Sequence, residues 1–187
     1  INPETGQGEI VVNTPCCMKG YYKNDEATQA AFTKDGWFRT GDLGALSKDG
    51  WIYIKGRLKN MIVGPSGENI YPEDIEEVLN SNRFVAESVV TEEDGKLIAL
   101  VYFDTPALEE AYDEFKHKMA VSKEQLALKM EDIKREVLEY VNSKVNRFSK
   151  ISKVVDNEGE FEKTPTKKIR RFMYDRSNKS TNDAVKK

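Results

Sequence analysis

The amino-acid sequence predicts an α+β fold, and three features of the chain lead to that class. Two Asp-Gly-Trp triplets, at 35–37 and 49–51, are each typical of a tight turn followed by a strand. Two strand-like runs, around 85–91 and 97–103, follow an amphipathic segment. Residues 105–147 then have the apolar spacing of two successive helices. Helices packed against a small antiparallel sheet define the α+β class.

The first part of the chain is predicted to consist of short strands joined by turns. The GEIVV sequence at 8–12 predicts one strand, and the aromatic and β-branched residues at 51–54 predict another. The Thr-Gly-Asp sequence at 40–42 predicts a turn, and the Gly-Arg pair at 56–57 lies at a strand end. Residues 35–58 are therefore expected to form small hairpins that carry polar groups at the strand ends, where binding groups often lie.

The second part predicts a helix followed by a small sheet. Pro72 suits the first turn of a helix, where its missing N–H costs nothing. Glu73 and Asp74 follow it where the helix dipole favours anions. A turn at 93–95 joins the two predicted strands, and a last strand is expected at 151–155. These elements predict a small sheet flanked by helices.

The segment 105–147 is predicted to be a helical hairpin. Thr105 and Pro106 suit the start of its first helix. Ser122 and Gln125 have the spacing of a capping box for its second helix. We interpret this hairpin as an elaboration of the sheet domain.

Composition and charge exclude several classes of function. The 187 residues are 39% hydrophobic and 33% charged, which is ordinary for a soluble protein, and no apolar run reaches the ~20 residues of a membrane helix. A net charge of −3 argues against a general nucleic-acid binder. Cys16 and Cys17 are adjacent, which suits neither a metal site nor a disulfide and fits a reducing cytoplasm. His117 is the only histidine, so neither a Ser-His-Asp triad nor a His-rich metal site is expected.

Three linked motifs lie between residues 36 and 78: FRTGD, GR and SGENIYPEDIE, in that order. Together they resemble the AMP-forming acyl-CoA synthetases, the adenylate-forming superfamily. Members of that family carry a Tyr/Phe-Arg-Thr-Gly-Asp motif, then a Gly-Arg pair, then a glycine loop that leads into a Pro/Ser-x-Glu-Ile-Glu helix start. The order of several motifs makes this resemblance more specific than any one of them.

A further motif, EFEKTPTKKIRRF at 160–172, supports the same resemblance. The family has a catalytic lysine within Lys-Thr-x-x-Gly-Lys-Ile-x-Arg or, in long-chain acyl-CoA synthetases, within Thr-Pro-Thr-x-Lys-Ile/Leu-x-Arg. The matching lysine here is Lys168, and Lys167 stands where the general family has glycine. A lysine after Thr-Pro-Thr is expected near a helix N-terminus, where the dipole disfavours a cation unless it faces an anion.

The resemblance implies a role for five residues. Asp42 would accept hydrogen bonds from the ribose hydroxyls of ATP, and Arg57 would assist at the nucleotide. Lys59 would be the hinge between a large domain and a C-terminal lid. Gly67 would lie where the glycine loop approaches the pantetheine of CoA, and Lys168 would act in adenylation. No metal ligand is expected in the chain.

The resemblance also implies a domain plan and a set of substrates. Residues 1–58 would end a large N-terminal adenylation domain, 59–175 would form the C-terminal lid, and 176–187 would be a disordered tail. The full-length protein would be a long-chain fatty-acid–CoA ligase that uses ATP, Mg²⁺, CoA and a fatty acid, and the chain alone would be inactive. Its own N-terminal domain would be its partner, nucleic acid would not be, and the protein would be cytoplasmic with a peripheral membrane contact.

Other interpretations of the same residues stay open at this point. Asp42 alone could cap a turn, Arg57 could be a surface cation, and Lys59 could be an exposed lysine at a strand end. An adenylate-forming enzyme could also use a carrier protein or an amine as acceptor. A third hypothesis is a non-catalytic lid-like module whose basic C-terminal segment, from residue 163 on, binds anionic partners or membranes.

Overall fold

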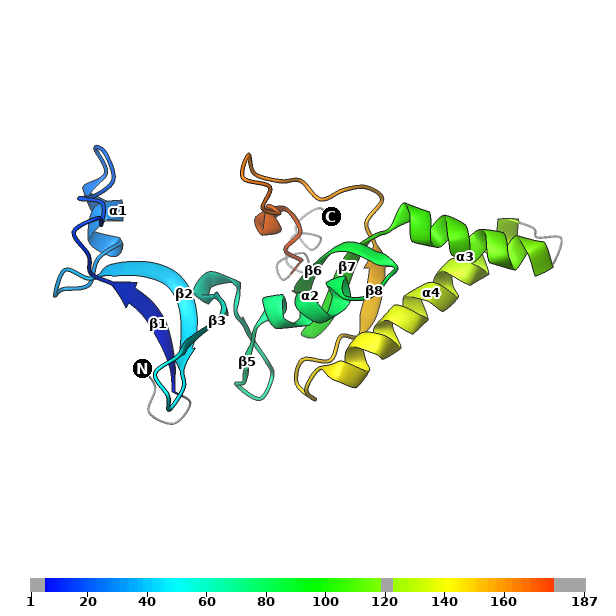
Figure 1. The fold of residues 1–187 in the computed structure, drawn as a ribbon, viewed down its shortest axis with the longest axis horizontal. Coiled ribbons are helices and arrows are strands. Elements are labelled where there is room, and N and C mark those ends of the chain that lie inside the picture. Colours follow the sequence, from blue (N-terminus) through cyan, green and yellow to red (C-terminus); the bar gives the residue numbers. More distant parts are fainter. Residues whose placement is uncertain (1–5, 119–122, 177–187) are drawn as a thin grey trace, which may run out of the picture. The chain divides into compact units, whose positions relative to one another are not determined.

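The computed structural model describes residues 6–118 and 123–176 (Figure 1). The chain divides into two compact units, Ile1–Met61 and Ile62–Lys187. Residues 177–187 of the predicted tail and Ser122 of the predicted capping box lie outside the described residues. That residues 1–58 end a larger domain stays a prediction.

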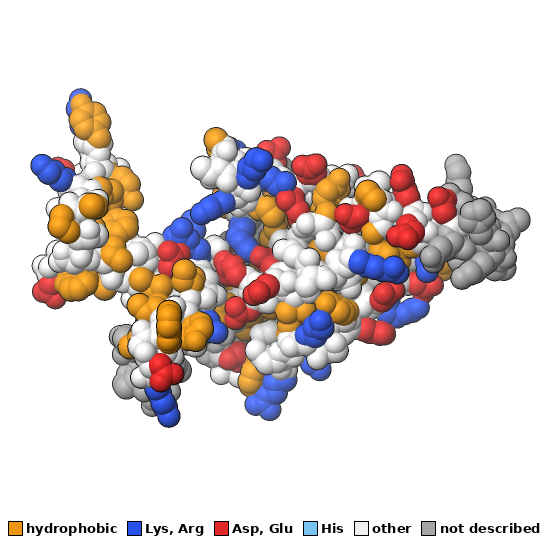
Figure 2. Space-filling view, viewed as in Figure 1, with side chains coloured by type: hydrophobic (Ala, Val, Ile, Leu, Met, Phe, Trp, Pro, Cys, Tyr) orange, Lys and Arg blue, Asp and Glu red, His pale blue; other side chains and the backbone are white. Residues whose placement is uncertain are grey.

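The first unit is built on a three-stranded antiparallel sheet in the order β1-β2-β3. Its strands are β1 (Gln7–Val12), β2 (Phe38–Leu46) and β3 (Ile52–Arg57). The 3-10 helix η1 (Leu58–Asn60) follows β3. Large apolar side chains of this unit are exposed, and Figure 2 shows hydrophobic side chains on its surface; the most exposed on and next to β3 are Trp51, Ile52, Tyr53 and Ile54.

A short helix, α1 (Asp25–Ala30), was not expected from the sequence. Asn24 caps it, because the Asn24 Oδ1 accepts a hydrogen bond from the Ala27 N–H at 2.9 Å. Asp25 and Glu26 lie in its first turn, where the helix dipole favours acidic side chains. These are the signals that could have predicted it.

The predicted turn at Thr40–Asp42 is wrong, because these residues lie inside β2. Glu9 of β1 pairs with Leu43 and Val11 pairs with Arg39, so three residues of β2 oppose one residue of β1. The extra residues form a bulge, and Gly41 takes a left-handed φ of +70° within it. The motif therefore bends a strand and does not end one.

The second unit begins with a two-stranded ribbon, β4 (Ile62–Val63) and β5 (Asn69–Ile70). The helix α2 (Pro72–Asn80) follows it, with Pro72 at its start as the sequence predicts. The strands β6 (Val85–Glu93) and β7 (Lys96–Phe103) pair antiparallel, and β8 (Lys153–Asp156) pairs parallel to β7. The predicted helical hairpin is confirmed as α3 (Thr105–Lys118) and α4 (Lys123–Lys144).

The sheet of the second unit has two covered faces. Alternate residues of a strand point to opposite faces. Leu97, Ala99 and Val101 of β7 pack with residues of α2 and α4, whereas Ile98 and Leu100 pack with Phe161 and the C-terminal segment. Figure 1 shows that segment, which ends in the 3-10 helix η2 (Arg171–Met173), running beside the sheet. One face is therefore covered by helices and the other by irregular chain.

The α+β class predicted from the sequence is thus confirmed, with small sheets and helices. Over residues 6–118 and 123–176, no helix is both long enough and apolar enough to span a bilayer.

Candidate functional site

Asp42 and Arg57 face each other across the first unit's sheet. They are register partners of β2 and β3, and the Arg57 Nε lies 3.0 Å from the Asp42 Oδ1. The Arg57 Nη1 also donates to the backbone oxygen of Thr40 at 3.0 Å. Both side chains are partly exposed, 46% for Arg57 and 31% for Asp42. The pair therefore presents a carboxylate and a guanidinium, held together, to whatever approaches this end of the strands.

Residues around the bulge hold Asp42 in place. The Thr40 hydroxyl donates to the Ile10 backbone oxygen at 2.7 Å and accepts from the Asp42 N–H at 3.0 Å. The Glu9 carboxylate accepts from the Gly41 N–H at 3.2 Å and pairs with Arg39 at 2.7 Å. Glu9 was not predicted as a site residue, although it lies inside the GEIVV strand. Asp42 lies within β2, and its side chain pairs with Arg57 across the sheet.

Lys59 lies in η1 with an exposed side chain. The structure places it two residues before Met61, where the first unit ends. Its predicted role as a hinge stays a prediction.

Gly67 lies in a tight loop between β4 and β5. The Gly64 N–H donates to the Glu68 oxygen at 2.8 Å, and the Gly67 N–H donates to the Gly64 oxygen at 2.9 Å. Gly67 has a left-handed φ of +81°, and an added Cβ would meet no atom within 4 Å. The loop Gly64–Glu68 is therefore a hairpin turn whose fourth residue, Gly67, must be left-handed. Glycine adopts that conformation without strain.

A cleft of about 410 Å³ lies at the base of this loop. Three segments of the second unit line it: the β4–β5 ribbon, the β6–β7 turn and the chain that follows α4. Its lining includes apolar residues and two cations, among them Ile62, Pro65, Ile70, Leu97, Phe148, Lys96 and Lys150. The acidic Glu92 also lines the cleft, so the candidate CoA-proximal loop borders a concave surface that carries apolar groups and charges of both signs.

Lys168 lies at the end of a second tight loop, Thr164–Lys168. The Thr164 N–H donates to the Lys168 oxygen and the Lys167 N–H to the Thr164 oxygen, both at 2.8 Å. The Thr164 hydroxyl accepts from the Lys168 N–H at 3.1 Å. Lys163 and Ile169 then form a single antiparallel bridge, so the loop closes a short hairpin. Both Lys167 and Lys168 are exposed.

The expected helix N-terminus near Lys168 is wrong. The chain at 164–168 is a turn, and the next helical residues are the three of η2, which begin at Arg171. The Pro165 ring starts the turn and does not start a helix, because the fourth position takes a left-handed φ that no right-handed helix allows. The dipole argument for a facing anion therefore does not apply.

Lys167 adopts that left-handed conformation, with φ of +60°. It occupies the position at which the Gly64–Glu68 loop has Gly67. This explains physically why glycine suits the family motif there: a residue with a Cβ is strained at positive φ.

Of the predicted site residues, the structure brings Asp42 and Arg57 together, in the unit that also contains Lys59. Gly67 and Lys168 lie on separate loops of the second unit. Within residues 6–118 and 123–176, no cluster of three or more His, Cys, Asp or Glu side chains could hold a metal ion. We assign no step to a metal held by these residues.

The fold of the second unit, with its small sheet, covering helices and C-terminal lysine hairpin, matches the C-terminal domain of adenylate-forming enzymes. A succinylbenzoate–CoA synthetase from Bacillus subtilis, solved with its acyl-adenylate, superimposes with a TM-score of 0.68 at 29% identity, over 90% of this chain and 30% of that one. The same synthetase with ATP and magnesium gives a TM-score of 0.68 at 28% identity, over 89% of this chain and 30% of that one. No family model matches the chain.

Sequence comparison gives the same class. The chain is 43% identical over 113 residues to a 2-succinylbenzoate–CoA ligase of Bacillus licheniformis, covering 58% of this chain and 23% of the relative. It is 49% identical over 76 residues to the long-chain-fatty-acid–CoA ligase FadD13 of Mycobacterium tuberculosis, covering 41% of this chain and 15% of the relative. The chain thus spans less than a quarter of the length of these curated relatives. The predicted resemblance is confirmed: the relatives are AMP-forming acyl-CoA ligases, the chain corresponds to their C-terminal part, and the long-chain branch is one of several that match.

Proposed function

We propose that the full-length protein containing this chain is an AMP-forming acyl-CoA ligase. A substrate carboxylate attacks the α-phosphorus of ATP and releases pyrophosphate. The thiol of CoA then attacks the acyl carbon, and AMP leaves as the thioester forms. The observation that carries this proposal is the paired Asp42 and Arg57 at the FRTGD and GR motifs, in a chain whose relatives are CoA ligases.

The first unit supplies the proposed nucleotide contacts. A carboxylate accepts hydrogen bonds only, so Asp42 suits the two neighbouring hydroxyls of a ribose. Arg57 pairs with Asp42 Oδ1 and orients the carboxylate that would face the nucleotide. The bulge held by Glu9 and Thr40 fixes the backbone that carries Asp42.

The second unit supplies the proposed contacts of the reacting groups. Lys168 places an ammonium between the carboxylate and the α-phosphate during adenylation. Gly67 allows the backbone to approach the pantetheine of CoA closely, because it lacks a Cβ. Lys59 is the proposed hinge at which the lid changes orientation between the two steps, so that a different loop serves each.

We further propose a long-chain fatty acid as the substrate. The Thr-Pro-Thr-Lys-Lys-Ile-Arg-Arg sequence at 164–171 and the identity to FadD13 support it. A second candidate is an aromatic acid such as 2-succinylbenzoate, which the 43% identity over 113 residues favours. We also propose a cytoplasmic protein with peripheral membrane contact, since Cys16 and Cys17 are free thiols and long-chain acids partition into membranes.

One experiment tests the proposed activity and the proposed substrate together. The full-length protein is incubated with ATP, Mg²⁺, CoA and a series of acids that includes fatty acids of increasing length and 2-succinylbenzoate. Pyrophosphate, AMP and the thioester are measured separately. We expect AMP and thioester in equal amounts with long fatty acids. Adenylate formation without CoA consumption would point to a carrier-protein or amine acceptor, and no pyrophosphate with any acid would overturn the proposed function.

A further inference from the structure

The helix α2 carries a buried acid, Glu76, whose side chain the proposed reaction does not use. Only 6% of Glu76 is exposed, and its neighbours Ile75 and Leu79 are fully buried. Its Oε1 accepts from the Val90 N–H of β6 at 2.7 Å. A buried carboxylate is costly unless it is paired, so its partner matters.

That partner is Arg171, which lies 95 residues away in the chain. The Arg171 Nη1 donates to the Glu76 Oε1 at 2.6 Å, and the Nη2 contacts the Glu76 Oε2. The Nη2 also lies 3.9 Å from the Glu73 Oε1. The guanidinium therefore binds Glu76 with both of its terminal nitrogens, which fixes orientation as well as position.

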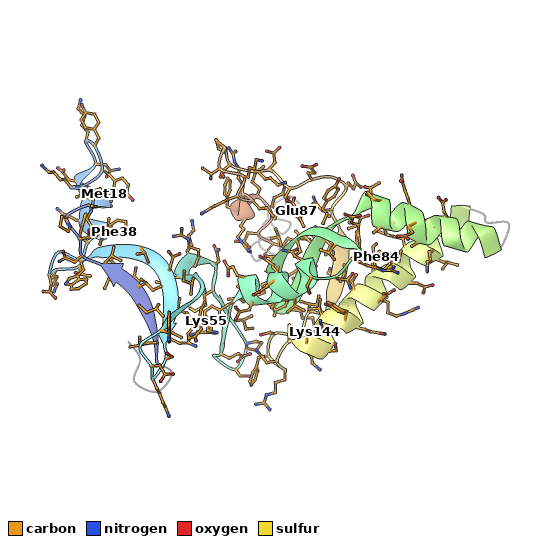
Figure 3. All side chains as sticks on the ribbon, viewed as in Figure 1. Met18, Phe38, Lys55, Phe84, Glu87 and Lys144 are labelled. Carbon is orange, nitrogen blue, oxygen red and sulfur yellow. The ribbon has the colours of Figure 1, made fainter. Side chains whose placement is uncertain are left out.

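Arg171 lies three residues after Lys168, at the start of η2, which directly follows the hairpin. Between the two, Ile169 packs on the core of the sheet's second face, and the Arg170 N–H donates to the Glu162 oxygen at 2.8 Å. On the other side of the loop, the Lys163 Nζ pairs with the Glu87 carboxylate of β6 at 2.7 Å; Figure 3 labels Glu87. The tip of the hairpin, with both lysines, is exposed, whereas its base is tied to α2 and β6.

We propose that the Glu76–Arg171 pair is a positioning device that fixes the Lys168 hairpin on the lid, so that the ammonium reaches the reacting groups in adenylation. This inference rests on the proposed function. Arg171 and Glu76 touch no reacting atom in it, and they act through Lys168. The two-point contact adds a fixed angle to the other ties of the hairpin, because a guanidinium held through two nitrogens cannot rotate about a single hydrogen bond.

The test compares two Arg→Lys substitutions in the full-length protein. Arg171→Lys keeps the positive charge and loses the two-nitrogen contact. Arg176→Lys is the matched control. Arg176 lies on the same C-terminal segment and its side chain is also 27% exposed, but its Nη1 pairs with Glu93 of β6 at 3.1 Å. Each half-reaction is measured in a single turnover, the second from supplied acyl-adenylate and CoA.

We expect Arg171→Lys to slow acyl-adenylate formation by about 10²-fold, the loss that a misplacement of about 1 Å can cause. Thioester formation should stay within about twofold, and Arg176→Lys should change neither step by more than about twofold. Glu76→Gln, which keeps the side-chain shape and an acceptor for the Val90 N–H, should show the same selectivity. An equal loss in both half-reactions for Arg171→Lys would overturn the inference and indicate a purely structural pair.

Double variants show whether the pair acts through Lys168. If it does, Arg171→Lys should change adenylation by less than about twofold when Lys168 is already alanine, because residues that act as a unit are not additive. A full additional loss in that background would contradict a positioning role.

Hydrogen exchange separates this inference from the proposed function, since it needs no activity. Arg171→Lys should speed exchange of the Lys168 and Arg170 amides, by about tenfold, while the amides between β6 and β7 keep their rates. If the wild-type protein forms no adenylate but Arg171→Lys still speeds exchange of these amides, the proposed function fails and the positioning of the hairpin stands. Unchanged exchange in an active enzyme, with no selective loss of adenylation, would defeat the inference alone.

Discussion

Two loops of the second unit, Gly64–Glu68 and Thr164–Lys168, share one backbone design. In each, the first residue's N–H donates to the fifth residue's oxygen at 2.8 Å, and the fourth residue's N–H donates back to the first residue's oxygen. Both have proline second, and both have a left-handed residue fourth. The two loops are therefore the same kind of turn, and their functions must come from the side chains they carry and from where they are attached.

The loops differ in attachment. Ile62 and Ile70, which flank the first loop, pack with the core on the helix-covered face of the sheet. Ile169, which follows the second loop, packs on the opposite face. The second unit thus has one turn of the same design on each side of a single sheet. This arrangement suits a reaction in which opposite faces of a lid serve successive steps, as proposed above.

The largest effect that we expect in the first unit is on the use of ATP, and it distinguishes the proposed role of Asp42 from the roles proposed for the two loops of the second unit. Asp42→Ala should lower kcat/KM for ATP by about 10- to 150-fold, because charge-assisted hydrogen bonds contribute roughly 1.5–3 kcal/mol. Steady-state kinetics of the full-length enzyme measure this. Asp49→Ala is the matched control, since Asp49 is exposed in a turn of the same unit. An Asp42 variant within twofold of wild type would restore the interpretation of Asp42 as a structural residue.

The next effect tests whether the fourth position of each loop has the same backbone demand. Gly67→Ala should destabilise the chain by up to about 1.6 kcal/mol, because a Cβ in the left-handed region costs about 1–2 kcal/mol and the loss of glycine offsets about 0.4–1 kcal/mol through the unfolded state. No atom lies within 4 Å of that Cβ, so the cost is conformational only. Lys167→Ala should change stability by less than about 0.5 kcal/mol, since that position already carries a Cβ. Urea unfolding of the 187-residue chain measures the stability of both variants. Equal losses of stability would show that the fourth positions of the two loops do not have the same backbone demand.

The converse substitution, Lys167→Gly, should stabilise the folded chain. Lys167→Gly removes a strain of about 1–2 kcal/mol and adds about 0.4–1 kcal/mol of unfolded-state entropy, which leaves a net gain of up to about 1.6 kcal/mol. The same unfolding measurement detects it as a higher midpoint with an unchanged slope. A loss of stability would mean that the Lys167 side chain makes a contact worth more than the strain.

A smaller effect concerns the pH dependence of the buried pair. Burial raises the pKa of the Glu76 carboxyl above its ordinary value of 4.5, and the Arg171 guanidinium opposes part of that rise. The folded state then holds the proton more tightly than the unfolded state, so the contribution of Glu76 to stability falls as the pH rises above 4.5. The difference in unfolding free energy between wild type and Glu76→Gln should therefore shrink with rising pH. A difference that grows would show that Arg171 outweighs burial.

The sequence predicted what depends on local chemistry. The Asp-Gly-Trp triplets form turns because Gly36 and Gly50 take positive φ, and Pro72 starts α2 because its missing N–H costs nothing there. The Thr-Pro-Thr sequence predicts a helix N-terminus near Lys168, and the left-handed conformation of Lys167 rules it out. The Glu76–Arg171 pair could not be found from spacing, since its two residues are far apart in the chain and meet only through the sheet.

We propose that Lys168 acts in one half-reaction only. A carboxylate and a phosphate repel by about 4 kcal/mol at 4 Å and an effective dielectric near 20, and an ammonium between them offsets this. Pre-steady-state measurement of Lys168→Ala should show adenylate formation slowed by roughly 10²–10³-fold and thioester formation from supplied acyl-adenylate unchanged. Lys167→Ala, one residue away on the same loop, should adenylate at close to the wild-type rate. Near wild-type adenylation by Lys168→Ala, or its loss in Lys167→Ala, would contradict the claim.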